Sequence, residues 1–379
     1  MSAANFVRLF SGLELLMSVV IEKAMEPKLR TTSAKLAAQY YSVLGRKVFF
    51  LVIALFLVGL SVALDITSGP SNLTISELLS VLWSPEDHET GLQVIVWDLR
   101  LPIALLALLV GAMLGMAGAE MQTILNNPLA DPFTLGISSA ASFGASVAIV
   151  FQWGGVPGYG GLIISTNAFM MALSTSVVLF AFTRMRGVTS ETMILVGIAL
   201  MFTYNALLAL MQYNASELQL AQIIFWMMGS LARASWNKVF ICVAIIAVIL
   251  PWFMSRNWSL TALRMGDDKA ASLGVNVKRL RIEMLIGVSL LAATAVSFVG
   301  TIAFVGLVGP HIARMIVGED QRYFLPLSAI SSGLILSLTS IVSKMINPGV
   351  VYPIGIITSL IGVPFFLSLV IAIRRKSWQ

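Results

Sequence analysis

Few residues in this sequence could perform chemistry without help from a partner. The chain contains two histidines, His88 and His311, and one cysteine, Cys242, and the three are far apart in sequence. Zinc sites and Ser-His-Asp or Cys-His centres need several such groups at characteristic spacings. The phosphate-binding pattern G-x-x-x-x-G-K-[ST] also does not occur. We therefore expect no enzymatic centre, no metal site and no bound cofactor in this chain.

Charged residues inside the apolar stretches are sparse, and they lie near the ends of those stretches. Glu120 and Glu283 fall near expected inner ends, and Asp65 and Lys344 near expected outer ends. Carriers driven by an ion gradient usually place ionisable side chains near the middle of the membrane, where such groups are costly unless they are used. The pattern disfavours an ion-coupled secondary transporter, and that class and a passive channel stay open as alternatives.

The elements that carry these residues are strongly apolar. Of the 379 residues 58% are hydrophobic and 11% charged, and the mean hydropathy is +0.91. Soluble domains carry about a quarter charged residues. The strands of a membrane β-barrel alternate in polarity, whereas the apolar run Val48–Leu64 is continuous. These features predict an all-α, polytopic membrane protein embedded in a lipid bilayer.

About ten stretches are long enough to cross, or nearly cross, a hydrocarbon layer of about 30 Å. They are residues 48–66, 101–122, 134–152, 164–183, 192–212, 239–255, 282–297, 298–311, 325–343 and 353–372. The segment 282–311 holds the seventh and eighth stretches. It could form either a tight hairpin of short helices or one long tilted helix.

The positions of the basic residues predict the orientation of these spans. With ten spans and a cytoplasmic N-terminus, every Lys and Arg is cytoplasmic except four, namely Arg100, Arg233, Lys238 and Lys344. The positive-inside rule describes this asymmetry. We therefore expect both termini in the cytoplasm. The formal charge of +6 then reflects membrane topology, and nucleic-acid binding is not expected.

The chain before the first apolar run has a different character. It carries seven Lys and Arg between Arg8 and Lys47, and the apolar core of a signal peptide would lie nearer the start. We expect residues 1–47 to form a cytoplasmic N-terminal extension, with an amphipathic helix around Phe10–Ile21. Residues 48–379 would form the transmembrane domain.

Two loops contain predicted short helices. In the outside loop 67–99, the stretch Ile75–Trp83 could form an interfacial helix. In the cytoplasmic loop 266–279, a short helix is predicted from Asp267 to Leu273, because acidic residues occupy its first turn and a glycine follows its end. Such a helix could dock into a groove of a soluble partner. It could instead be a solvated loop that only satisfies the charge bias.

Four stretches have the residues and spacing of one known family. The longest begins at Arg100-Leu-Pro, continues through the glycine-rich segment 109–122 and Asn127-Pro-Leu-Ala-Asp-Pro132, and ends at Leu135-Gly-Ile-Ser-Ser139. The other three are Ala270–Gly274, Phe304–Arg314 and Tyr352–Phe366. Over about 48–372 the chain resembles the ATP-driven permeases that import iron–siderophores, haem and cobalamin.

This resemblance implies a fold, a location and a set of partners. The fold is that of a type II ABC importer permease in the cytoplasmic (inner) membrane of a bacterium or archaeon. The subunit would pair with a second permease subunit, identical or paralogous, and the substrate path would lie at their interface. Two ATPase subunits would bind below and would use the ATP. A periplasmic or lipid-anchored substrate-binding protein would dock above.

The resemblance also implies a role for the 266–279 loop in binding the ATPase. The residues of this docking loop would be Asp267, Asp268, Ala270, Ala271, Leu273, Gly274 and Val275. In the family two acidic residues often stand directly before the alanines, whereas here Lys269 is interposed.

Two further regions receive roles from the resemblance. Arg100 and Lys344 would contact the substrate-binding protein, although Arg100 could instead be an interfacial anchor. The second arginine of the family's R-L-P-R pattern is replaced by Ile103. The region of the inner mouth and gate would contain Asn127, Pro128, Asp131 and Pro132.

The expected function is translocation of an iron–siderophore, or a related metal chelate, by alternating access. Haem and cobalamin are the alternatives within the family, because their permeases share these motifs. No residue in the sequence distinguishes among the three.

Overall fold

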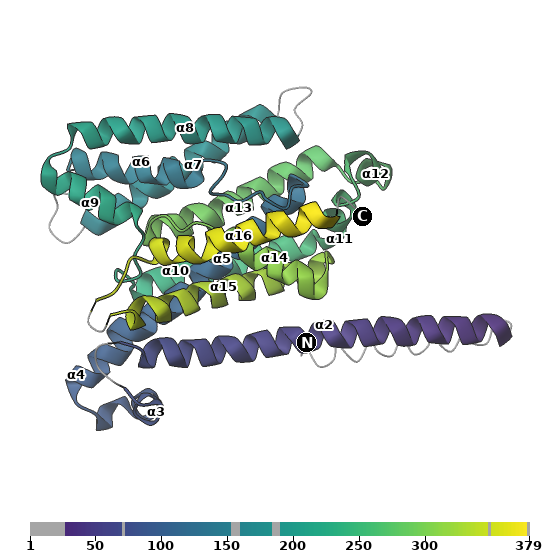
Figure 1. Cartoon of the computed structure of the whole chain (residues 1–379), viewed down its shortest axis with the longest axis horizontal. Helices are drawn as coiled ribbons and strands as arrows, with labels where there is room; N and C mark the ends of the chain where they lie inside the picture. Colours follow the sequence, from purple (N-terminus) through teal and green to yellow (C-terminus); the bar gives the residue numbers. More distant parts are fainter. Residues whose placement is uncertain (1–26, 70–72, 153–159, 184–189, 348–349, 377–379) are drawn as a thin grey trace. The chain divides into compact units, whose positions relative to one another are not determined.

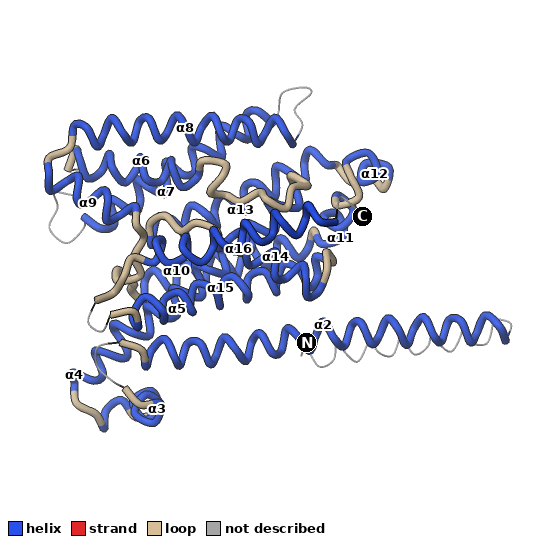
Figure 2. The backbone as a smooth tube through the Cα atoms, in the orientation of Figure 1, coloured by secondary structure: helices blue, strands red, loops and turns tan. Residues whose placement is uncertain are grey.

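The computed structural model describes residues 27–69, 73–152, 160–183, 190–347 and 350–376. Within these ranges the regular structure is helical, apart from one isolated bridge between Asn347 and Val350 (Figure 2). The chain divides into two compact units, Met1–Val52 and Ile53–Gln379, which we describe separately.

The described part of the first unit is the beginning of helix α2 (Pro27–Thr67), which continues into the second unit. At a rise of about 1.5 Å per residue, a helix of 41 residues is about 60 Å long, twice the thickness of a hydrocarbon layer. The helix therefore extends well beyond its predicted span of 48–66. The predicted helix around Phe10–Ile21 lies outside the described residues, and the division at residue 47 stays a prediction.

Ten apolar helical stretches of the described chain match the ten predicted spans. Seven have the length of a full crossing: Leu44–Thr67 of α2, Thr90–Ile124 ending in α5 (Leu101–Ile124), α7 (Gly160–Thr183), α8 (Ser190–Asn214), α10 (Trp236–Ser255), α13 (Val277–Val299) and α15 (Gln321–Met345). Three are shorter: α6 (Ile137–Val150), α14 (Val305–Val317) and the apolar part, to Ser368, of α16 (Ile354–Lys376). The prediction of an all-α, multi-pass membrane protein is confirmed.

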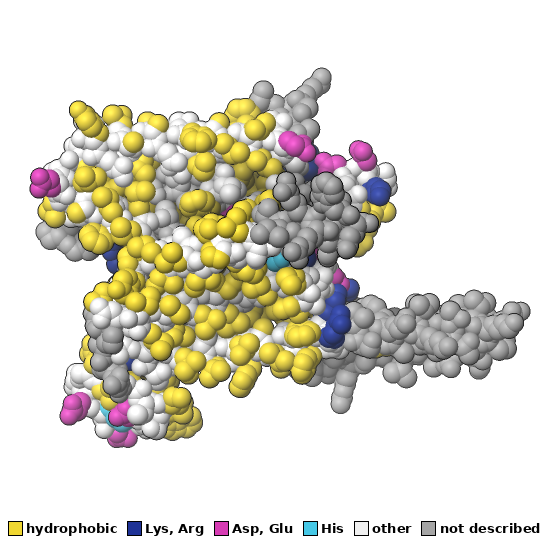
Figure 3. Space-filling model, in the orientation of Figure 1, with side chains coloured by type: hydrophobic (Ala, Val, Ile, Leu, Met, Phe, Trp, Pro, Cys, Tyr) yellow, Lys and Arg dark blue, Asp and Glu magenta, His cyan; other side chains and the backbone are white. Residues whose placement is uncertain are grey.

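Helix α5 lies at the centre of the second unit and packs against α10, α13, α14 and α15 (Figure 1). A second group, in which α6 packs against α7 and α8, joins the first through α13. Apolar side chains cover much of the visible surface of both groups, as expected of helices that face lipid (Figure 3). The spans define two ends, which we name the α3 end and the α12 end after helices α3 (Ile75–Trp83) and α12 (Asp267–Ser272).

Close packing around α5 depends on its glycines. A Cβ atom on Gly111 would lie 2.5 Å from the Ser332 carbonyl oxygen of α15, and one on Gly118 would overlap the Gly306 carbonyl oxygen of α14. Pro310 has no N–H to bond this Gly306 carbonyl within α14. Small residues permit this approach of two backbones, as in other membrane helix pairs.

The segment 282–311 forms neither of the two predicted arrangements. Helix α13 is a full-length helix that ends at Gly300 (φ 83°), and α14 begins after Phe304 (φ 67°). Both residues have a positive φ, which a right-handed helix cannot continue through. The predicted boundary between the seventh and eighth spans at 297/298 was therefore wrong, and α14 continues to Val317.

Several short helices connect the spans. Helix α3 has the predicted bounds, and its start is fixed by a capping box in which Thr74 and Glu77 bond each other's backbone N–H groups. It is followed by η1 (Pro85–Asp87), α4 (Thr90–Gln93) and the π-helical η2 (Val94–Arg100). Two further short helices, α9 (Glu217–Met227) and α11 (Asn257–Leu263), were not predicted from the sequence.

Candidate functional site

The predicted docking loop contains a short helix bounded by two glycines. Helix α12 follows Gly266 (φ 101°) and is terminated by Gly274 (φ 84°), and the N–H of Val275 donates to the Ala270 carbonyl at 3.1 Å. Both φ values lie where glycine is favoured, so these residues set the length of the helix. The predicted local structure is confirmed, and the docking role stays a prediction.

The residues of this loop divide into a buried side and an exposed side. Ala270 and Val275 are buried and hold the loop on the protein. The exposed members of the predicted docking set are Asp267, Asp268, Ala271, Leu273 and Gly274. Acidic side chains are visible around α12 in Figure 3. An anchored inner side and an exposed outer side allow a short helix to enter a groove of a partner.

The predicted gate region begins where α5 ends, after Ile124, and its own polar side chains hold its turn. Asn127 Oδ1 accepts the N–H of Leu129 at 2.9 Å, and Asp131 Oδ1 accepts the N–H of Phe133 at 3.3 Å. These side chains replace backbone partners that the ended helix does not supply.

Within this region the structure separates exposed from buried residues. Pro128 is exposed and Asn127 is partly buried, whereas Asp131 and Pro132 are buried. The Asp131 carboxyl lies against α14, since a Cβ on Gly306 would be 2.8 Å from Asp131 Oδ1. Burial raises the pKa of Asp131 to about 6, and the hydrogen bond from Phe133 opposes this rise. The gate region is therefore packed directly on a spanning helix.

Polar contacts tie the last turn of α5 to its neighbours at the α12 end. Arg314 Nη2 of α14 donates to Gln122 Oε1 at 2.8 Å, and Gln321 Nε2 of α15 donates to Thr123 Oγ1 at 2.9 Å. Arg264, which follows α11, forms an ion pair with Glu319 between α14 and α15. The last turn of α5, α14, the start of α15 and the residue after α11 thus share one polar layer.

Glu120 lies in the same layer but is not hydrogen-bonded within it. The residue is fully buried, and neither carboxyl oxygen has a hydrogen-bond partner in the described part of the chain. The sequence placed Glu120 near the inner end of the second span. Its spacing from other residues did not indicate that the nearby Gln122 and Thr123 bind α14 and α15.

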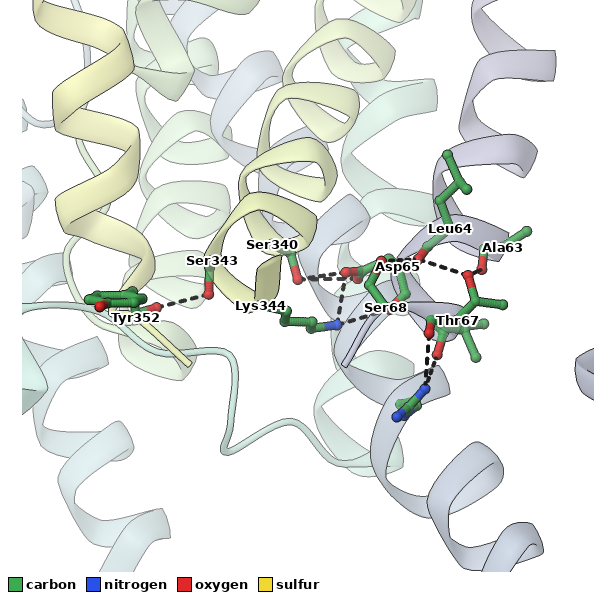
Figure 4. A network of polar contacts seen from close by, with 11 residues as sticks. Ala63, Leu64, Asp65, Thr67, Ser68, Ser340, Ser343, Lys344 and Tyr352 are labelled. Atoms are coloured by element: carbon green, nitrogen blue, oxygen red, sulfur yellow. Dashed lines mark hydrogen bonds and ion pairs between the residues drawn. The ribbon is translucent and has the colours of Figure 1, made fainter. Parts of the chain in front are cut away.

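At the α3 end, Arg100 and Lys344 both bind the last turn of α2. Figure 4 shows Lys344 beside Asp65. Lys344 Nζ lies 2.8 Å from Asp65 Oδ1 and 3.1 Å from the Asp65 carbonyl oxygen. Arg100 Nη1 donates to the Ile66 carbonyl at 2.7 Å and to that of Thr67 at 3.4 Å. The last carbonyls of a helix lack partners within it, and these two side chains supply them.

This arrangement gives both predicted docking residues internal partners. Arg100 is only 8% exposed and the Lys344 side chain only 9%. The two other outside basic residues lie elsewhere. Arg233 is exposed in the loop before α10, and Lys238 donates to the carbonyls of Arg233 (2.9 Å) and Phe298 (3.3 Å). A pocket of about 430 Å³ includes Arg233 and Lys238 in its lining.

Three breaks between helices meet in a junction that sequence reasoning missed. The N–H of Ser230 donates to Val299 O at 2.7 Å, the N–H of Gly355 donates to Met228 O at 3.0 Å, and Thr301 Oγ1 donates to Met227 O. These groups form one another's hydrogen bonds at positions where no helix supplies a backbone partner. The sequence feature that marks this junction is a glycine in each of the three breaks, namely Gly229, Gly300 and Gly355.

An open, mainly apolar pocket of about 650 Å³ lies against this junction. Its lining combines the loop after α9, the α13–α14 connection and one face of α16. Irregular backbone in a membrane protein is tolerated where it is buried or lines a cavity. The junction meets this condition, because its irregular backbone lines the pocket.

The fold is that of a multi-pass membrane protein with a short, largely exposed helix, α12, at one end. Comparison with known proteins identifies the family of this membrane protein. The profile of the FecCD transport family matches residues 51–372. A protein of Methanocaldococcus jannaschii, provisionally named an ABC transporter permease, is 38% identical over 87% of this chain and 96% of its own.

Two further relatives extend this comparison. The vitamin B12 import system permease protein BtuC of Yersinia pseudotuberculosis is 32% identical over 80% of this chain and 90% of its own. A solved inward-facing conformation of an ABC transporter, assigned to the metal-chelate type, superposes with a TM-score of 0.75 at 30% identity, covering 85% of this chain and 99% of the other. The chain belongs to the FecCD transport family and is an ABC transporter permease.

Proposed function

We propose that this protein is the membrane subunit of an ATP-driven importer and that it translocates an iron–siderophore or a related metal chelate. Membership of the FecCD transport family supports the importer. The provisional assignment of the solved relative to the metal-chelate type supports the substrate class. The BtuC relative makes cobalamin the main alternative, and haem is the third member of the same set.

In this proposal the α12 end faces the cytoplasm, as do both termini, in the cytoplasmic membrane of a prokaryote. The positive-inside rule supports this orientation. Arg256 and Arg264 lie between α10 and α12, and Arg279 and Arg281 lie in the first two turns of α13.

One observation carries the coupling mechanism, namely that α12 is anchored by Ala270 and Val275 while Leu273 is 49% exposed. Two ATPase subunits would hold the exposed side of α12 and its partner copy, and the ATP would be hydrolysed there. A ligand shifts a conformational equilibrium only by contacting the two states differently. The contact between α12 and the ATPase must therefore differ between the ATP-bound and ATP-free states, and this difference drives alternating access.

The substrate path in this proposal runs along the 650 Å³ pocket at the helix junction. The pocket is open on one side, so a second permease subunit, identical or paralogous, would close it. The gate region 127–132 would form the cytoplasmic mouth of this path.

A substrate-binding protein would dock at the α3 end. Arg100 and Lys344 are held by α2, so we infer that they shape this surface by fixing the end of that helix, while exposed Arg233 is available for direct ion pairs. Rim charges of this kind mainly set orientation and association rate.

The substrate is tested by uptake into proteoliposomes that contain the complete transporter with its binding protein and ATP. A ferric hydroxamate, a ferric catecholate, haem and cyanocobalamin are offered separately at equal concentration. Accumulation of a ferric siderophore is expected. Accumulation of cyanocobalamin or haem alone would contradict the proposed substrate while retaining the importer.

A further inference from the structure

Arg281 joins three separate elements at the α12 end. It lies in the second turn of α13, and its side chain is only 11% exposed. Its Nη1 and Nη2 atoms lie 2.8 and 2.9 Å from the two carboxyl oxygens of Asp267, at the start of α12. Its Nε donates to the Ile124 carbonyl at 2.9 Å, and Nη2 also donates to Ser190 Oγ at 2.9 Å.

Each partner of Arg281 stands at an important point of its own element. Asp267 is the first residue of the docking helix, and Ser190 is the first residue of α8. Ile124 is the last residue of α5, three residues before Asn127 of the gate region. Carbonyls in the last turn of a helix have no partner within it, so Arg281 supplies the bond that the end of α5 lacks.

The geometry requires an arginine. A guanidinium has five N–H donors in a rigid plane, which can serve a carboxylate with two bonds and still reach other acceptors. Lysine, with a single ammonium centre, cannot reproduce the same set of directions. The nearby Arg279 on the same helix is different, because its side chain is 75% exposed and pairs only locally with Glu283.

We propose that Arg281 is the positioning residue that couples the docking helix to the gate region. It makes α12, the end of α5 and the start of α8 move as one body when α12 is displaced. This inference rests on the proposed function, in which an ATPase displaces α12. Without Arg281, the ATPase still binds α12 and hydrolyses ATP, but the displacement of α12 no longer reaches residues 127–132.

The first test measures uptake and ATP hydrolysis together in proteoliposomes that contain the complete transporter. In Arg281→Gln the substrate moved per ATP hydrolysed should fall about tenfold, the range of a typical coupling energy between two sites. ATPase copurification and hydrolysis should persist. Arg279→Gln is the matched control and should remain near wild type. An unchanged ratio in a correctly assembled Arg281→Gln transporter would overturn the proposal.

A second test follows the gate region itself. Leu129 is exposed in that region, and the native Cys242 is fully buried, so Leu129→Cys provides a site for a thiol reagent against low background. Its labelling rate should depend on ATP in the parent and in Arg279→Gln, and should become independent of ATP in Arg281→Gln. A residue that only stabilised the fold would not remove the ATP response in assembled protein. Persistence of that response would count against the linkage.

A third variant covers the case in which Arg281→Gln does not assemble. Asp267→Asn removes the ion pair from the exposed side, because the Asp267 side chain is 52% exposed, and leaves Arg281 its other two partners. Its coupling ratio should fall about threefold, as expected for one contact of a coupling network. An unchanged ratio in Asp267→Asn would then overturn the proposal. If the parent itself shows no ATP-dependent uptake, the proposed function fails first, and the two failures are thus distinguished.

Discussion

Nζ of Lys344 lies 2.8 Å from Oδ1 of Asp65, and this ion pair joins α15 to the last turn of α2. Asp65 is fully buried, and Ser340 Oγ donates to the same carboxyl at 2.9 Å. Removal of one partner from a buried pair leaves an uncompensated charge, which costs far more than the pair contributes. The pair therefore controls the stability of the α3 end.

Lys344→Met should lower the free energy of unfolding by about 3–5 kcal/mol, because it leaves the Asp65 carboxylate buried without its cation. Thermal unfolding of the purified protein in detergent measures the effect. The double variant Asp65→Leu/Lys344→Met should recover much of the loss, and Lys269→Met, at an exposed position, is the control. A Lys344→Met protein as stable as wild type would refute the assignment.

Gly118→Ala should destabilise the protein by about 1–3 kcal/mol or prevent assembly, because the added methyl group overlaps the Gly306 carbonyl. The matched control is Gly59→Ala in α2, where nothing lies within 4 Å of the new Cβ. That control should be neutral or slightly stabilising, since alanine favours a helix by about 1 kcal/mol over glycine. Equal stabilities of the two variants would contradict the close approach of α5 and α14.

Because of Asp131, the free energy of unfolding should fall as the pH rises from about 4 to about 6.5. Its folded pKa of about 6 lies above the ordinary value of 3.8, so its protonated form favours the folded state, and this contribution is lost as the pH rises through 6. The shift corresponds to at most about 3 kcal/mol.

Asp131→Asn should remove this part of the pH dependence, as measured by denaturation at several pH values in detergent. Exposed Asp98→Asn provides the control and should follow wild type throughout. Parallel curves for wild type and Asp131→Asn between pH 4 and 6.5 would show that the carboxyl is not held in the described environment.

Gly274 should tolerate asparagine far better than valine. Its φ of 84° lies in the left-handed region, and no atom lies within 4 Å of the position that a Cβ would occupy. The cost of a side chain is therefore conformational, about 1–2 kcal/mol for a β-branched residue. In the complete transporter Gly274→Val should reduce the substrate moved per ATP, and Gly274→Asn should retain most of it. Equal coupling in both variants would argue that the end of α12 does not matter for docking.

Much of the fold could be predicted from the sequence because lipid imposes simple rules. Long apolar runs identify the spans, and the acidic first turn and following Gly274 predicted α12, because such signals act within one or two turns. The α13–α14 connection was harder, because it depends on left-handed Phe304 and on contacts with the junction at Gly229.

The choice of side-chain partners could not be predicted. The family resemblance assigned Arg100 and Lys344 to contacts with a binding protein, which stays a prediction, and nothing in the sequence indicated that each binds a backbone carbonyl of α2. The partners of Arg281 are 14 to 157 residues away in sequence, so no local pattern indicates them. Tertiary packing decides which cation meets which acceptor.

The central claim is that transport is driven by ATP on partner subunits. The direct measurement is chelate uptake into proteoliposomes that contain this protein with or without its ATPase, each with ATP or with a non-hydrolysable analogue. Accumulation against a gradient should require both the ATPase and hydrolysable ATP. Accumulation by this chain alone under an ion gradient would identify a secondary transporter, and equilibration unaffected by ATP would identify a channel. Either result would contradict the account.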